Sequence, residues 1–264
     1  MLKYNPLDLK LTQEADEKLM RTILWFIFFW LYLLKLLPDQ AKADALSKAG
    51  RTEELDALVD RIVRKWARAM LWAGGVRVTV SGADNIPSGP AVIVSNHQGN
   101  FDIPILLASL DKPKGFVAKV EIQKMPMIRT WMKYLNCIFI DRSDARQSIT
   151  ALSGASSLLE SGHSLIIFPE GTRSKSARVG EFKAGALKMA LKAGVPVVPV
   201  VIDGSWKIME RQGKWIRPGH VDLRILPPVG TKGLSKDEAR TLGEDIRQLI
   251  TKDLAAHAGK DSIS

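Results

Sequence analysis

A histidine and an aspartate lie close together in the stretch VIVSNHQGNFDIP, which runs from Val92 to Pro104. A neutral imidazole accepts protons near neutral pH, and a neighbouring carboxylate can fix its orientation, so His97 and Asp102 could form a general-base pair. A structural interpretation is also open, in which Asp102 caps the following helix and His97 occupies a turn. The spacing alone does not choose between the two.

The local pattern around this pair predicts a strand, a turn and a helix. AVIVSN is expected to end a strand at Asn96, and DIPILLASL is expected to begin a helix near Asp102. Gly99 permits a tight turn between them. In one continuous helix His97 and Asp102 would point about 140° apart, whereas the strand–turn–helix lets the carboxylate fold back toward the imidazole.

Further polar groups follow apolar runs downstream. CIFIDR ends in Asp141 and Arg142, LIIFPEGTRS carries its polar residues after Phe168, and FKAG and VPVVPV come next. Groups placed just after parallel strands gather at one edge of an α/β sheet, where such folds bind ligands. The alternative is ordinary surface charge for Arg142 and Arg173 and a solvated loop for EGTRS.

From Val76 onward, short β-branched runs alternate with helical patterns, which predicts a layered α/β domain. Ser235 and Glu238 have the spacing of a capping box. Strands are expected at VRVTV, AVIVS, GFVAK, CIFID, SLIIF, VPVVPVVI and VDLRIL, and helices near 103–110, 126–134, 146–161, 183–193 and 236–257.

The N-terminal region contains the most hydrophobic stretch, Ile23 to Leu37. As a helix it would reach about 22 Å, short of a hydrocarbon core of about 30 Å, and Lys35 interrupts it. Its aromatic residues suit a membrane interface, so a helix lying in one leaflet is expected. A cleavable signal is the alternative, but the preceding residues carry equal numbers of acids and bases rather than a positive leader.

A second helix is expected from about Glu53 to Trp72, because apolar residues recur there at helical spacing. Together the two helices could form a hairpin that anchors the protein to a membrane. The second helix could equally pack on the domain without touching lipid.

Composition narrows the function classes. The net charge is +10, and residues 112–188 carry 13 Lys and Arg against 6 Asp and Glu. Such a region suits a phosphate-bearing substrate, an acidic lipid surface or a nucleic acid, unless it is simply a solvated face. The single cysteine, Cys137, cannot form an internal disulfide and is expected to be a buried apolar residue of a protein in a reducing, intracellular setting.

Several chemistries lack their motifs. The 4 histidines are far apart and no Cys/His cluster exists, so no metal site is expected. G-x-S-x-G, Walker A and G-x-G-x-x-G motifs are absent, which disfavours serine hydrolases, nucleotide hydrolases and dinucleotide enzymes. The interleaved aromatic and basic residues of RNA- or DNA-binding modules are also missing.

Four boxes in this order resemble the glycerolipid acyltransferases, in particular the bacterial lysophosphatidic acid (1-acylglycerol-3-phosphate) acyltransferases. NHQGNFD supplies the Asn-His-x4-Asp box, FIDR the second, FPEGTRS the third and VPVVPV the fourth, together spanning about residues 92–200. The chain departs from the family at Gly99, where serine is frequent, and at Asn136, where glycine is frequent.

The resemblance implies an α/β acyltransferase domain at 76–264, with a mixed sheet flanked by helices. It also implies a preceding two-helix membrane anchor in residues 1–75, at the cytoplasmic face of the cell membrane. The implied reaction moves an acyl group from acyl-CoA or acyl-carrier protein to the free hydroxyl of 1-acylglycerol 3-phosphate, giving phosphatidic acid. The acyl donor is a co-substrate, no cofactor or nucleic-acid partner is expected, and donor identity, chain length and oligomeric state are left open.

The resemblance also assigns roles to residues. His97 is expected to take the proton from the acceptor hydroxyl, and Asp102 to orient and stabilise the imidazolium. No serine or cysteine nucleophile is expected beside them, which favours direct transfer. The residues expected to bind the acceptor and its phosphate are Glu170, Gly171, Thr172 and Arg173, joined by Arg142, Lys119 and Lys183.

Rival functions remain. The same chemistry could act on another lysophospholipid or on a lyso-aminolipid. A non-catalytic peripheral lipid-binding protein is a rival of a different class, although binding alone needs no general base. Nucleic-acid binding is a further rival, based on charge alone.

Overall fold

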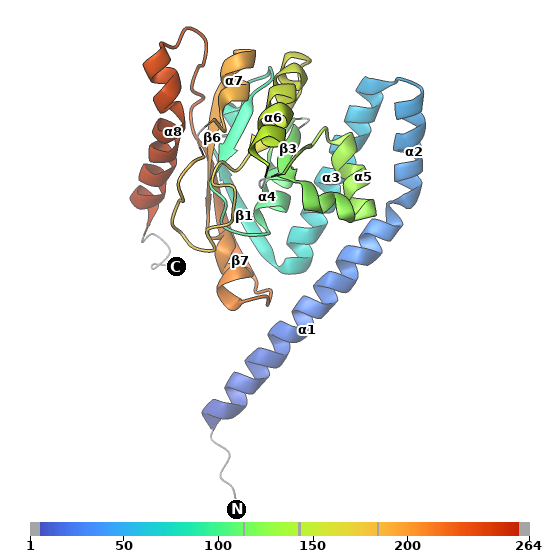
Figure 1. Cartoon of the computed structure of the whole chain (residues 1–264). Coiled ribbons are helices and arrows are strands. Elements are labelled where there is room, and N and C mark those ends of the chain that lie inside the picture. The colour runs from blue at the N-terminus through green and yellow to red at the C-terminus, as the bar shows by residue number, and fades with distance from the viewer. Residues whose placement is uncertain (1–5, 113, 142–143, 184, 259–264) are drawn as a thin grey trace, which may run out of the picture.

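The computed structural model describes residues 6–112, 114–141, 144–183 and 185–258. A sheet of seven strands lies between two layers of helices, and α1 extends away from the body of the molecule toward the N-terminus (Figure 1). The strands are β1 (Val76–Ser81), β2 (Val92–Ser95), β3 (Lys114–Lys119), β4 (Ile138–Ile140), β5 (Ser164–Ile167), β6 (Val197–Asp203) and β7 (Gly219–Ile225). All the expected strands are therefore confirmed.

Helices precede the sheet and connect its strands. The α-helices are α1 (Pro6–Lys35), α2 (Leu37–Lys48), α3 (Thr52–Gly74), α4 (Asp102–Ser109), α5 (Pro126–Tyr134), α6 (Ala145–Glu160), α7 (Lys188–Ala193) and α8 (Lys236–His257), and the 3-10 helices are η1 (Ala83–Asn85), η2 (Val120–Lys124), η3 (Ser205–Lys207) and η4 (Glu210–Gln212). The helix expected over 183–193 begins only at Lys188, because Gly185 has a left-handed φ of 82°. The capping box at the start of α8 is confirmed.

The strand order is β1-β7-β6-β2-β5-β3-β4. The β6–β7 pair is antiparallel and every other neighbouring pair is parallel, so the sheet is mixed as expected. The strands β6, β2, β5 and β3 consequently run in the same direction, and their carboxyl ends lie at one edge.

Successive side chains of a strand pack on opposite faces of the sheet. In β2, Ile93 packs in the core cluster beneath α3 and α4, whereas Val92 and Val94 pack in the cluster beneath α6, α7 and α8. All three side chains are fully buried. A strand covered on both faces needs apolar residues at every position, which explains the unbroken apolar run before Asn96.

The N-terminal region contains three helices rather than the two expected, and α1 begins well before the apolar run. Pro38 explains the break between α1 and α2, because proline has no N–H and its ring clashes with the preceding helical turn. Within the described ranges, no single helix is long and apolar enough to cross a bilayer, and only the bent pair Asp16–Lys35 and Leu37–Lys48 meets those criteria together. The division at residue 75 and the anchor remain predictions.

Helix α3 joins this region to the domain. Its apolar face, which includes Leu58, Ile62 and Met70, is buried. The indole N–H of Trp25 on α1 donates a hydrogen bond to the carbonyl of Met70 at 3.0 Å. Glycine ends α3, since the capping residue Gly75 has a left-handed φ of 67°.

A buried lysine fixes α3 to the sheet. The Lys114 side chain is fully buried, and its ammonium donates to the carbonyls of Leu110 and Lys112 and to the Asp60 carboxylate. Burial lowers the pKa of Lys114 from 10.5 to about 8, although Asp60 partly opposes the shift.

This shift predicts a pH dependence of stability. Between pH 8 and 10.5 the unfolded chain binds a proton at residue 114 that the folded chain releases, so the lysine's contribution should become more favourable as the pH rises. The unfolding free energy of the wild type minus that of Lys114→Met should therefore increase over this range, by up to about 3 kcal/mol. Denaturant titrations measure it, with the exposed Lys65→Met as control. A difference that stays flat would contradict the assignment.

Candidate active site

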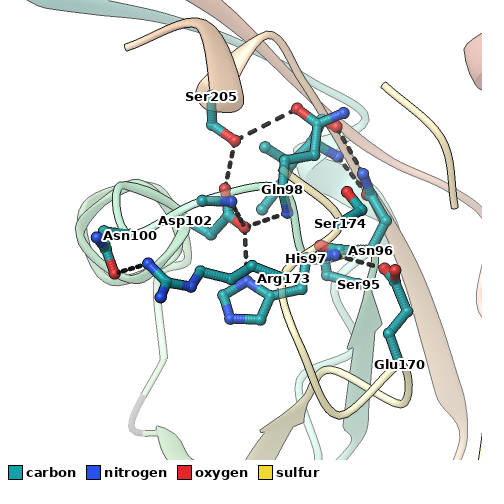
Figure 2. Close-up of polar contacts among 12 residues, drawn as sticks. Ser95, Asn96, His97, Gln98, Asn100, Asp102, Glu170, Arg173, Ser174 and Ser205 are labelled. Atoms are coloured by element: carbon teal, nitrogen blue, oxygen red, sulfur yellow. Dashed lines mark hydrogen bonds and ion pairs between the residues drawn. The ribbon is translucent and has the colours of Figure 1, made fainter. Parts of the chain in front are cut away.

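The polar residues that follow β2, β5 and β6 meet at the common carboxyl edge of these neighbouring strands. His97 follows β2, Glu170 follows β5 and Ser205 follows β6 (Figure 2). This is the edge at which α/β folds bind ligands, and the sequence predicted it for the first two segments.

Asp102 is the centre of this cluster and is fully buried. Its Oδ2 atom accepts hydrogen bonds from His97 Nδ1 at 2.7 Å, from the Gln98 amide at 2.7 Å and from the Gly99 amide at 2.9 Å. Its Oδ1 atom accepts from the Ser205 hydroxyl. Asp102 therefore does not cap α4: its partners precede the helix, and the capping position, Phe101, makes no side-chain cap.

The geometry fixes the tautomer and the plane of the His97 ring. A carboxylate oxygen only accepts hydrogen bonds, so Nδ1 must carry the proton, which leaves the Nε2 lone pair free in the neutral ring. The ring stacks on Phe168, with centroids 4.0 Å apart and planes inclined by 16°. With 16% of the side chain exposed, His97 is held rigidly but is accessible.

Side-chain amides attach the His97 loop to the end of β6. Asn96 exchanges two hydrogen bonds with the backbone of Ile202, at 2.8 and 2.9 Å. The Gln98 side-chain oxygen accepts from the Gly204 amide at 3.0 Å. These contacts explain why the residues flanking His97 are amides, which both donate and accept.

The segment that follows β5 braces the loop from the other side. Glu170 accepts hydrogen bonds from the His97 amide at 2.7 Å and from the Gly180 amide at 2.8 Å. The Ser174 amide donates to the His97 carbonyl at 2.8 Å. Burial raises the pKa of Glu170 above its ordinary value, and the two amide hydrogen bonds partly oppose the rise.

Arg173 lies beside the His97–Asp102 loop. Its Nη1 donates to the Asn100 side-chain oxygen at 2.5 Å and to Glu210 at 3.2 Å. The side chain is 36% exposed, whereas that of Glu210 is only 4% exposed. A half-exposed guanidinium with a buried carboxylate behind it is positioned to meet an anion.

An apolar cavity of about 540 Å³ opens beside His97. Its volume lies in the range of sites that bind small molecules. The polar side chains of its wall are His97, Asn100, Lys119, Thr172 and Arg173, and the apolar wall comes from α1, α3, α4, α5 and the sheet, with Phe29, Leu33, Val63, Leu107, Met132 and Cys137 among its residues.

The remaining predicted residues are distributed around this site. Lys119 is half-exposed, pairs with Glu121 at 3.3 Å and lines the cavity. The Lys183 amide donates to the Pro169 carbonyl, and its side chain covers Gly171, whose φ of 70° favours glycine. Arg142 lies outside the described residues.

The comparisons with known proteins agree with this geometry. Residues 77–203 match the family model described as Acyltransferase. A probable 1-acyl-sn-glycerol-3-phosphate acyltransferase of Mycoplasma genitalium is 35% identical over 190 residues, which is 70% of this chain and 69% of that protein. The chain belongs to the acyltransferase family.

Other similar proteins of this acyltransferase family extend the comparison. A probable 1-acyl-sn-glycerol-3-phosphate acyltransferase of Mycoplasma pneumoniae is 40% identical over 145 residues, or 53% of this chain, and the chain spans only 54% of that protein's length. The crystal structure of the 1-acyl-sn-glycerophosphate (LPA) acyltransferase PlsC from Thermotoga maritima is 28% identical, with a TM-score of 0.78 over 93% of this chain and 98% of that one.

Sequence reasoning missed three residues of this acyltransferase site. Ser205, Glu210 and Asn100 were not selected, although the first two follow β6 just as the selected residues follow β2 and β5. No serine nucleophile was expected beside the His–Asp pair, and the serine found there, Ser205, donates a hydrogen bond to Asp102. Ser205 is nevertheless fully buried and is not among the cavity-lining residues, so it is not positioned as a nucleophile.

Cys137 lies in the cavity wall rather than only in the core. Its sulfur accepts a hydrogen bond from the Phe116 amide at 3.3 Å. Burial raises its pKa to about 12, so the thiolate needed for nucleophilic attack is not formed near neutral pH.

The contacts of Glu170 predict a mainly structural effect of its removal. Glu170→Ala leaves the His97 and Gly180 amides without their charged acceptor, which should lower the unfolding free energy by about 1.5–3 kcal/mol and lower kcat. Denaturant unfolding and steady-state kinetics test this, with the exposed Glu181→Ala as control. An unchanged stability with a raised acceptor KM would instead assign Glu170 to acceptor binding.

Proposed function

We propose that this protein transfers an acyl group from an acyl thioester to the free hydroxyl of 1-acylglycerol 3-phosphate, giving phosphatidic acid. The observation that carries the proposal is the position of the His97–Asp102 pair at an apolar cavity whose wall also contains Arg173. Such a site offers a general base, a cation for a phosphate and an apolar space for an acyl chain. The names of the similar proteins support the same acceptor.

In the proposed reaction His97 acts as the general base. The acceptor oxygen attacks the thioester carbonyl carbon as its proton moves to Nε2, and Asp102 stabilises the resulting imidazolium through Nδ1–H. The tetrahedral intermediate then collapses, the carbon–sulfur bond breaks, and the leaving thiolate takes the proton from Nε2. Direct transfer is favoured because neither Ser205 nor Cys137 is placed and ionised as a nucleophile.

Arg173 is proposed to bind the acceptor phosphate. A guanidinium has five N–H donors in a planar fork that matches two phosphate oxygens. Asn100 and Glu210 engage Nη1, and among the residues that the structure describes Nε and Nη2 have no partner. Thr172 and Lys119 also line the cavity and are proposed as further partners of the acceptor, and Glu170 and Gly171 as residues that shape its loop.

The cavity is proposed to hold an acyl chain. Its wall is predominantly apolar, and burying a chain there yields about 0.8 kcal/mol per methylene. Acyl-CoA and acyl-carrier protein both deliver a thioester, and the proposal includes either donor. No cofactor is required for this chemistry.

The outer face of α1 is proposed to dock on one leaflet of a membrane. The two faces of this helix have different surroundings. Phe29 and Leu33 line the cavity, whereas large apolar side chains on the other face are exposed. The backbone amide of Ile216, in a loop, donates a hydrogen bond to the Thr22 hydroxyl on α1. The exposed apolar residues include Leu19, Met20, Ile23, Leu24, Phe26, Ile27, Trp30, Leu31 and Leu34 on α1, together with Trp72 and Trp215.

Product analysis tests the proposed function directly. The purified full chain in detergent or lipid vesicles is given a panel of lysolipids, including a lyso-aminolipid, with acyl-CoA or acyl-carrier-protein donors. Phosphatidic acid formed from 1-acylglycerol 3-phosphate is the expected product, identified by mass. Faster conversion of another lysolipid would assign the acceptor differently, and binding without any product would favour a lipid-binding protein.

The His–Asp pair should behave as one catalytic unit. His97→Ala should lower kcat by about 10²–10⁴-fold, the usual contribution of a general base. Asp102→Asn keeps the size of the side chain and one oxygen that can accept from His97 and the Gln98 and Gly99 amides, but it removes the charge that stabilises imidazolium, so kcat should also fall by orders of magnitude. The double variant should be little worse than either single one. Steady-state kinetics measure all three.

Thermal melting provides the control for these variants. Asp102→Asn should melt close to the wild type, and the exposed Asp237→Asn should change neither activity nor stability. An active Asp102→Asn enzyme, or one that loses activity only in proportion to stability, would show that Asp102 has a structural role alone.

Removing the Arg173 guanidinium should weaken acceptor binding. The lost charged hydrogen bonds should cost about 1.5–3 kcal/mol, equivalent to a rise in acceptor KM of roughly 10- to 150-fold. The donor KM of Arg173→Ala should change little. Arg240→Ala, an exposed change of equal charge on α8, is the control. Unaltered acceptor kinetics in Arg173→Ala would remove this residue from the site.

Docking on one leaflet predicts that both ends of the N-terminal region face the same compartment. Single cysteines at Asp16 and at Arg77, both exposed, should react equally with a membrane-impermeant maleimide added from the cytoplasmic side. Labelling of the two positions from opposite sides would instead show that the region crosses the bilayer.

A further inference from the structure

A buried carboxylate, Glu210, lies behind Arg173 and has no task in the reaction described above. It begins η4, beyond the last of the four sequence boxes. Its Oε1 atom accepts from the Asn100 amide at 2.8 Å and from Arg173 Nη1 at 3.2 Å. Its Oε2 atom is buried and has no hydrogen-bond partner among the described residues.

The same carboxylate faces Gly99. A Cβ atom placed on Gly99 would overlap Glu210, and the three nearest atoms it would meet all belong to Glu210. The backbone of Gly99 is not in the left-handed region, so φ does not oppose an L side chain there, but a Cβ atom would require the Glu210 carboxylate to move. This explains the glycine at a position where the family frequently has serine.

The pKa of the buried Glu210 carboxylate depends on the groups around it. Burial raises the pKa of Glu210, whereas the Asn100 amide, its own backbone amide and Arg173 lower it. The two groups that Glu210 contacts in the site therefore help to keep it charged. A buried carboxylate that is 4% exposed has little freedom to move away from them.

We propose that Glu210 is a positioning residue that holds Arg173 at the cavity through Nη1, and that Gly99 is required because Glu210 fills the space beside it. The proposal rests on the proposed function, in which Arg173 binds the acceptor phosphate. Glu210 touches no substrate and acts only through Arg173 and the Asn100 amide.

The hydrogen-bond pattern of Arg173 supports this role. Asn100 and Glu210 both receive their hydrogen bonds from Nη1. Among the described residues neither Nε nor Nη2 of Arg173 has a hydrogen-bond or ion-pair partner, and these two atoms form one edge of the guanidinium. That edge matches two oxygens of a phosphate. The contacts of Asn100 and Glu210 with Nη1 would therefore orient the guanidinium and leave this edge free to bind a phosphate.

The test compares two acceptors that differ only in the phosphate. Kinetics of the full chain are measured with 1-acylglycerol 3-phosphate and with 1-acylglycerol, and the ratio of their kcat/KM values is the readout. Glu210→Ala should raise the KM for the phosphorylated acceptor about tenfold, which is ~1.4 kcal/mol, and lower the ratio by the same factor. Rates with the phosphate-free acceptor and the donor KM should match the wild type.

The variant Glu210→Gln distinguishes the positioning of Arg173 by Glu210 from the effect of its negative charge. Glu210→Gln keeps an oxygen that accepts from Arg173 and the Asn100 amide, and a neutral hydrogen bond has roughly half the strength of a charged one. This variant should keep the ratio within about threefold of the wild type. A Gln variant as impaired as the Ala variant would assign the effect to charge and overturn the positioning role.

The glycine provides a rescue experiment. Gly99→Ala should displace the Glu210 carboxylate and lower the ratio of kcat/KM values as Glu210→Ala does. In the Glu210→Ala background the space beside position 99 is open, so adding Gly99→Ala should lower the ratio no further. Gly154→Ala is the matched control, because a Cβ there meets no atom within 4 Å. An equal loss from Gly99→Ala in both backgrounds would overturn the pairing of the two residues.

Arg173→Ala distinguishes failure of this proposal from failure of the proposed function. If Arg173→Ala lowers the acceptor ratio and Glu210→Ala does not, Glu210 is not the positioning residue, although the phosphate site stands. If Arg173→Ala itself leaves the ratio unchanged, the phosphate assignment fails and the role of Glu210 fails with it. Thermal melting confirms that each variant is folded, and Gly99→Ala tests the clamp if Glu210→Ala does not fold.

Discussion

The Asp102 carboxylate is fully buried, and a buried charge is stable only when hydrogen-bond donors surround it. The imidazole of His97, two successive backbone amides and the Ser205 hydroxyl supply those donors. The amides of Gln98 and Gly99 turn inward only if residues 97–101 form an irregular loop. The shape of the loop that carries His97 is therefore a consequence of satisfying one carboxylate.

The rest of the site depends on this arrangement. Because Ser205 follows β6, the carboxylate connects neighbouring strands, and the Asn96 contact with Ile202 repeats the connection. Phe168 and Glu170, which follow β5, hold the ring and the amide of His97 from the other side. These contacts hold His97 in the wall of the apolar cavity.

Much of the fold could be predicted from the sequence because its signals are local. Runs such as SLIIF and VPVVPVVI are β-branched and continuously apolar, as strands covered on both faces must be. The positions of His97, Glu170 and Arg173 after such runs placed them at one edge of the sheet. Helix α2 was not predicted, because its sequence, LPDQAKADALSK, has no clear apolar face.

The residues that were missed act across long sequence separations. Ser205 contacts Asp102 across 103 positions, and Glu210 contacts the Asn100 amide across 110. No spacing rule connects such pairs, since they meet only because β6 lies beside β2 in the sheet. Similarly, Cys137 was expected in an apolar core, and only the packing of α5 against the sheet shows that a cavity lies beside it. Gly99 was expected to permit a turn and was noted as a departure from the family pattern, but its contact with Glu210 could not be predicted from the sequence.

Asp102 holds the proton of the neutral His97 ring on Nδ1 and leaves Nε2 free to accept one. Nitrogen-15 NMR of the histidine rings in the full-length protein tests this most directly, with His97→Ala identifying the signal of His97. At a pH where the ring is neutral, we expect a protonated Nδ1 and an unprotonated Nε2. A neutral ring protonated on Nε2 would contradict it, because that tautomer could neither donate to Asp102 nor accept the proton of an acceptor hydroxyl.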